Sequence, residues 1–131
     1  MKAAGRLGIL SSAILLVLWL GCTIPPPEKL PLTVEDAKST LDRWNPQYCK
    51  VAEFYGFHEA GDDTLVAFVL VASPTHPDVK PSLYEARFQL VTRPDGRQQW
   101  FLTSLMNHAA GLTRRQGWDN LFIPVHKSSG Q

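Results

Sequence analysis

The sequence has few cysteines and almost no net charge. Cys22 and Cys49 are its only cysteines among 131 residues, which excludes a framework of several disulfides. The 13 lysines and arginines nearly balance the 12 aspartates and glutamates, so the formal net charge is +1. A chain without a basic excess has no electrostatic footprint for nucleic acid. We therefore predict no nucleic-acid partner and a fold stabilised by an ordinary apolar core.

Recognised patterns for metal binding and catalysis are also absent from the sequence. The four histidines, at positions 58, 76, 108 and 126, lack the spacing of metal ligands. There is no glycine-rich phosphate loop and no serine bracketed by glycines as in a nucleophile elbow. Cys49 precedes His58 by nine residues, but a small core residue is a simpler interpretation than a nucleophile beside its base. The sequence thus predicts no metal, no cofactor and no assigned catalytic residue.

Residues 1–22 have the pattern of an export signal. Lys2 and Arg6 form a positively charged start, and a long apolar stretch follows them. The stretch ends in Leu18-Trp19-Leu20-Gly21-Cys22, which resembles the lipobox of bacterial lipoproteins. The resemblance implies that Cys22 is diacylated and becomes the first residue of the mature protein. The domain that follows would then be tethered to a membrane by lipid.

Two other interpretations of the N-terminal segment remain open. The 18 uncharged residues 7–24 could be an uncleaved anchor, because at ~1.5 Å rise per residue a helix of that length spans ~27 Å. The segment could also be a simple cleaved secretory signal. In a bacterium, Lys2 and Arg6 stay on the cytoplasmic side and the domain lies outside the cytoplasm. Thr23 stands where an aspartate directs inner-membrane retention in enteric-type sorting, so an outer-membrane destination is compatible with the lipoprotein interpretation.

Proline dominates the stretch between the signal and the domain. Four prolines occur within residues 23–31 and favour an extended polyproline conformation. At ~3.1 Å per residue, these nine positions would span up to ~28 Å. We predict a stiff tether over 23–32, one domain over 33–126 and a polar tail over 127–131, although a linker without a spacing role explains the composition equally well.

A helix is predicted to open the domain. Thr33 provides a hydroxyl cap and is followed by two acids in the first turn. Apolar residues then recur at spacings of three, four and three, at Val34, Ala37, Leu41 and Trp44. Proline 46 disfavours a helical conformation at the residue before it, so the helix should end near Asn45.

Strands are predicted for most of the remaining chain. Aromatic and β-branched residues from 50 to 57 indicate a strand, and the polar residues 58–63 indicate a turn. The unbroken apolar run 65–72 predicts a strand inside the sheet with both faces covered. Three prolines make 73–81 a loop.

A hairpin is predicted next. Residues 84–90 alternate between apolar and polar, 93–97 carries the proline and glycine of a turn, and 100–106 forms the returning strand. We expect 107–116 to be a loop or short helix and the apolar segment 118–125 to dock against the sheet.

The order of one helix and two antiparallel hairpins resembles the cystatin-like and NTF2-like group of small α+β domains. The resemblance implies an N-terminal helix packed on a curved antiparallel sheet of about four strands. In that group the sheet often forms a concave surface that holds a small apolar ligand or a partner protein. Candidate residues for such a surface are Tyr84, Phe88, Trp100 and Phe101, although core packing explains them equally well. A second candidate site, for an anionic ligand, consists of Arg114, Arg115 and Trp118. A simple surface turn is the alternative interpretation of these residues.

Two functional hypotheses follow. The first is a non-enzymatic binding protein of the cell envelope or an accessory subunit of a membrane complex. The alternative is a small NTF2-like enzyme, an isomerase or hydrolase, that uses a buried carboxylate or tyrosine. The candidates for that role are Glu53, Glu85, Tyr55 and Tyr84.

Overall fold

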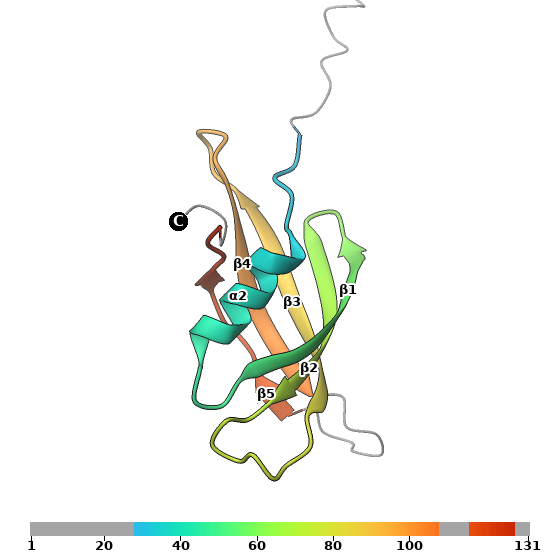
Figure 1. The fold of residues 1–131 in the computed structure, drawn as a ribbon. Coiled ribbons are helices and arrows are strands. Elements are labelled where there is room, and N and C mark those ends of the chain that lie inside the picture. Colours follow the sequence, from blue (N-terminus) through green and yellow to red (C-terminus); the bar gives the residue numbers. More distant parts are fainter. Residues whose placement is uncertain (1–27, 108–115, 128–131) are drawn as a thin grey trace, which may run out of the picture.

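One helix and six strands form the domain (Figure 1). The structure is a computed structural model that describes residues 28–107 and 116–127. The elements in these ranges are α2 (Val34–Trp44), β1 (Lys50–Gly61), β2 (Thr64–Ala72), β3 (Ser82–Thr92), β4 (Gln98–Asn107), β5 (Gln116–Trp118) and β6 (Ile123–Pro124). The predicted signal segment, the start of the tether and most of the 107–116 connection lie outside the described residues.

Helix α2 begins and ends where the sequence predicts. The Thr33 hydroxyl accepts a hydrogen bond from the Asp36 amide at 3.1 Å, and the helix ends at Trp44 with Asn45 as its C-cap. Its buried face differs from the predicted stripe at two positions. Val34 is 40% exposed, whereas Thr40 is buried. Thr40 is tolerated there because its hydroxyl donates to the Asp36 carbonyl at 2.8 Å.

The sheet is antiparallel and contains more strands than the four expected. Its order is β1-β2-β3-β4-β5, and β6 pairs with β4 as well. The two extra strands come from the late apolar segment, which docks on the sheet as predicted. Trp118 lies opposite Leu105, and Ile123 lies opposite Leu102. Strands of two and three residues are too short to show alternation in sequence, so only pairing with β4 defines them.

Strand β1 is longer than predicted. It continues through His58 to Gly61, and the turn to β2 contains only two residues, because Gly61 pairs with Thr64. The polar side chains near this end are tolerated in a strand because β1 lies at the edge of the sheet. Register shifts between Val51 and Glu53 and between Phe54 and Phe57 accompany the bend of β1 in Figure 1.

Helix α2 packs on one face of this sheet, and the core lies between the two layers (Figure 1). The predicted alternation in β3 is confirmed, since Ala86, Phe88 and Leu90 are buried and Arg87 and Gln89 are exposed. The other core residues include Ala37, Leu41, Ala67, Val69, Leu102 and Leu105. The predicted loop 73–81 and the turn 93–97 are also confirmed, the turn by a hydrogen bond from the Arg93 amide to the Arg97 carbonyl at 2.8 Å. The domain is therefore α+β, with one helix on an antiparallel sheet.

Gly117 is the residue on which the β4–β5 pairing depends most directly. Its φ is +149°, and a Cβ added there would lie 2.1 Å from the Leu105 carbonyl oxygen. We predict that Gly117→Ala lowers the free energy of unfolding by at least about 2 kcal/mol, because strain and backbone overlap combine. Urea unfolding measures this change. Gly61→Ala is the matched control, since an added Cβ there meets only ordinary contacts at 3.8 Å; equal losses in both variants would contradict the prediction.

Candidate functional site

The structure separates the residues predicted to line one concave surface. Phe88 is fully buried at the centre of the core, and Trp100 is 6% exposed. Trp100 lies opposite Leu90 on the helix side of the sheet, whereas Phe101 lies opposite Gln89 on the other face. Consecutive strand residues point to opposite faces, so Trp100 and Phe101 cannot line the same pocket. Arg114 and Arg115 lie outside the described residues.

Tyr84 and Trp118 do come together, with Trp44. The Tyr84 and Trp118 rings stack at 6.3 Å, and Trp44 meets Trp118 edge to face at 5.2 Å. Burial is the main cause that raises the pKa of Tyr84, Cys49 adds to the rise, and a hydrogen bond with the Asn107 side chain opposes it. The Tyr84 hydroxyl is therefore protonated at neutral pH. This aromatic cluster closes the end of the core beside β5.

The four side chains named for the enzyme alternative do not converge. Glu53 and Tyr55 are exposed on the edge strand β1, where the Tyr55 hydroxyl donates to Glu53 at 3.3 Å. Glu85 lies on the sheet face opposite Tyr84, because the two are consecutive in β3. Its carboxylate pairs with Arg87 at 3.7 Å. No shared site is formed by these four residues.

Cys49 is a fully buried thiol at the start of β1. Burial, with a smaller contribution from Asp42, raises the pKa of Cys49 from 9.0 to about 12. The thiol is therefore protonated and lacks the thiolate that a nucleophile needs. As the pH rises, Cys49 loses its proton in the unfolded chain before it does so in the folded protein. The protonated thiol therefore makes its full contribution to the free energy of unfolding below pH 9, and this contribution is lost as the pH rises towards 12.

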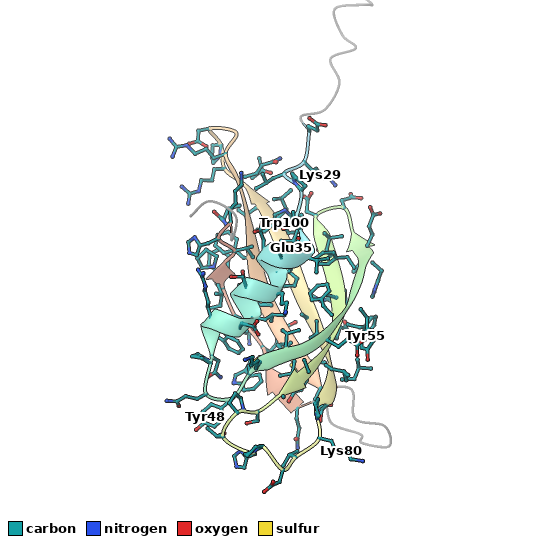
Figure 2. The ribbon with its side chains drawn as sticks, viewed as in Figure 1. Lys29, Glu35, Tyr48, Tyr55, Lys80 and Trp100 are labelled. Carbon is teal, nitrogen blue, oxygen red and sulfur yellow. The ribbon has the colours of Figure 1, made fainter. Side chains whose placement is uncertain are left out.

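Residues 28–32, here called the strap, lie across the end of the sheet where the chain enters the domain (Figure 2). Lys29 donates to the Asp62 carbonyl and pairs with the Asp63 carboxylate at 3.4 Å. The Leu30 amide donates to the Gln98 side chain at 2.7 Å.

The Trp100 indole completes this attachment. Its N–H donates to the Leu30 carbonyl at 2.7 Å. Leu30 and Leu32 pack against the core, and a cavity of about 190 Å³ remains between the strap and Trp100. The strap is thus joined to the β1–β2 turn and to β4.

A second feature, here called the outer-face groove, lies on the sheet face opposite α2. Its volume is about 550 Å³. Its lining includes two residues of β3, Arg87 and Gln89, and three residues of β4, Thr103, Ser104 and Met106. Residues 119–122 form one side of the groove. Sequence reasoning missed this groove, although the polar positions of β3 were predicted to face away from the core.

Residues 119–122 are fixed against the sheet by several contacts. The Leu121 amide donates to the Thr103 carbonyl at 2.9 Å. Asn120 has a φ of 54° and its amide donates to the Asp119 carboxylate at 2.8 Å. The Phe122 ring lies flat on Phe101, with centroids 3.9 Å apart and an angle of 8° between the planes. One face of Phe122 is covered by Phe101, while the residue remains 64% exposed.

No known protein family, curated protein or solved structure matches this chain. Within the described ranges, no helix has the length and apolar character needed to cross a membrane. Nor do three or more His, Cys, Asp or Glu side chains gather around a potential metal position in residues 28–107 and 116–127.

Cys49 is expected to be chemically inert in the folded protein. In a Cys22→Ser chain, where Cys49 is the single thiol, alkylation by a maleimide at pH 8 should be at least about a hundredfold slower than in the urea-unfolded chain. The raised pKa and the burial both reduce the reactive thiolate. Mass spectrometry over time measures the two rates, and similar rates in both states would refute the assignment of Cys49 to the core.

The strap should loosen when the indole hydrogen bond is removed. Trp100→Phe keeps an aromatic ring but leaves the Leu30 carbonyl without the indole N–H, at a cost of about 1 kcal/mol. We expect trypsin to cleave after Lys29 about fivefold faster, as read from the released fragment. Trp118→Phe is the control, because Trp118 takes part in none of the hydrogen bonds or ion pairs found for the strap. Equal acceleration in both variants would show that the effect is general destabilisation.

Proposed function

We propose that this chain is a membrane-tethered lipoprotein of the cell envelope. It acts either as a non-enzymatic binding protein or as an accessory subunit of a membrane complex. Its domain belongs, in this proposal, to the cystatin-like and NTF2-like group. The observation that carries the proposal is the strap, because it joins the predicted tether to the domain through three side chains. The lipobox-like end at Cys22 provides the anchor.

The strap gives the tethered domain a preferred orientation. The chain enters beside the β1–β2 and β3–β4 turns, whereas the loop 73–81 and β5 lie at the opposite end (Figure 1). Residues 28–32 are attached to the domain, so in this proposal the spacer after Cys22 would be residues 23–27, and five residues in an extended form would span about 16 Å. The end bearing the two turns would face the membrane, and the outer-face groove would remain accessible from the side.

Binding has more support than catalysis. The groove offers amide, hydroxyl and aromatic groups on one face of the sheet. By contrast, Glu53 and Tyr55 are exposed, and Glu85 and Tyr84 lie on opposite faces. The thiol of Cys49 and the phenol of Tyr84 both have raised pKa values, so neither supplies a base or nucleophile at neutral pH.

Mass spectrometry of the mature N-terminus tests the anchor. The full chain, expressed in a Gram-negative bacterium and recovered from membranes, should begin at Cys22 and carry the mass of a diacylglyceryl group. The Cys22→Ser chain should lack this mass and leave the membrane fraction or stay uncleaved. An intact Met1 in the unaltered chain would contradict the lipoprotein proposal.

Co-purification from native membranes tests the second part of the proposal. An accessory subunit should bring stoichiometric protein partners with it, whereas a free-standing binding protein should not. Turnover of a small molecule that is lost when one groove residue is substituted would overturn the non-enzymatic assignment.

A further inference from the structure

We propose that the outer-face groove binds a neutral glycan, with a sugar ring seated on Phe122. This inference rests on the proposed function, because an exported and tethered domain meets the polysaccharides of the envelope. It adds a ligand class and a site to that proposal. Three properties of the groove support this inference: an aromatic platform, side chains that both donate and accept hydrogen bonds, and formal charges of opposite sign that cancel.

Phe122 forms the platform. Phe101 covers one face of its ring at 3.9 Å, and the residue is still 64% exposed, so the other face is available to a ligand. The ring is held in place, because the Leu121 amide is bonded to the Thr103 carbonyl and Pro124 pairs with Phe101. The face of an aromatic ring is electronegative and attracts the weakly positive C–H groups on the flat side of a sugar. A rigid platform also binds with little loss of side-chain entropy.

The polar residues around Phe122 suit hydroxyl groups. Gln89, Ser104 and Asn120 each carry a side chain that can donate and accept. None of the three side chains is hydrogen-bonded to another residue in the described part of the chain. A sugar hydroxyl has the same dual character, so each of these groups can be satisfied by a glycan. A purely apolar ligand would instead leave them unpaired when it excluded water.

The charges of the groove select against ionic ligands. Arg87 and Asp119 are the charged residues among those that line it, and their formal charges cancel. Arg87 is moreover paired with Glu85 at 3.7 Å, which reduces its attraction for an anion. Among the residues that the structure describes, the groove therefore has no cluster of cations of the kind that phosphate or an anionic lipid headgroup would need. A neutral, polyhydroxylated ligand fits the aromatic, amide and hydroxyl groups together.

Titration calorimetry tests the site. The full chain with Cys22→Ser, in mild detergent without a sugar headgroup, is titrated with tetra-N-acetylchitotetraose and with maltotetraose, and separately with inorganic phosphate. We expect heat of binding with at least one oligosaccharide and none with phosphate. Phe122→Ala should weaken the binding about tenfold, and Phe122→Tyr should retain it within about threefold. Tyr55→Ala is the matched control, since Tyr55 is an aromatic residue 56% exposed on β1, outside the groove.

Three outcomes would overturn the inference. Absence of binding to both oligosaccharides at millimolar concentration is one, and binding of phosphate alone is another. The third is an equal loss of affinity in Phe122→Ala and Tyr55→Ala, which would place the ligand elsewhere. The proposed function fails separately, by an intact Met1 in the membrane-recovered chain, so a lipidated chain without glycan binding refutes only the ligand class.

Discussion

The pairing of β3 with β4 is the contact on which the two faces of this domain depend. Leu90 opposite Trp100 and Gln89 opposite Phe101 fix the register at one end of the pair, and side chains alternate from there. A register shift between Arg87 and Phe88 leaves Thr103 without a partner in β3, so Thr103 and Ser104 both line the outer face. One face then carries apolar residues that pack against α2, and the other carries polar residues around an aromatic platform. A shift of one residue in this register would exchange the faces and expose the core.

The strap extends the same arrangement beyond the sheet. Trp100 fills the core with its ring and holds the entering chain with its indole N–H, so packing and tethering share one side chain. Lys29, also in the strap, pairs with Asp63 in the β1–β2 turn. Residues 28–32, which precede the helix, are therefore part of the folded structure. A force applied to the chain before residue 28 would act first on these polar contacts, before it reached the core.

The buried thiol of Cys49 and the half-buried phenol of Tyr84 serve packing. Burial raises the pKa of Cys49 and that of Tyr84, so both stay neutral in the apolar layer beneath α2. The groups suited to contact with a ligand lie on the opposite face, where Phe122 stacks on Phe101. The sheet thus separates a face packed against α2 from a face that carries exposed polar and aromatic side chains.

The sequence by itself determined the elements whose signals are local: the cap at Thr33, the alternation in β3, the proline-rich loop 73–81 and the turn 93–97. It also predicted docking of the late segment. The strand predicted over 100–106 already places Trp100 and Phe101 on opposite faces, but only the tertiary structure decided that Trp100 is the one facing α2 and that residues 119–122 border a groove. Those features join residues far apart in the chain, and the pairing that brings them together depends on the register of long-range contacts. Periodicity indicates which side of a strand is apolar, but not which neighbour lies across from it.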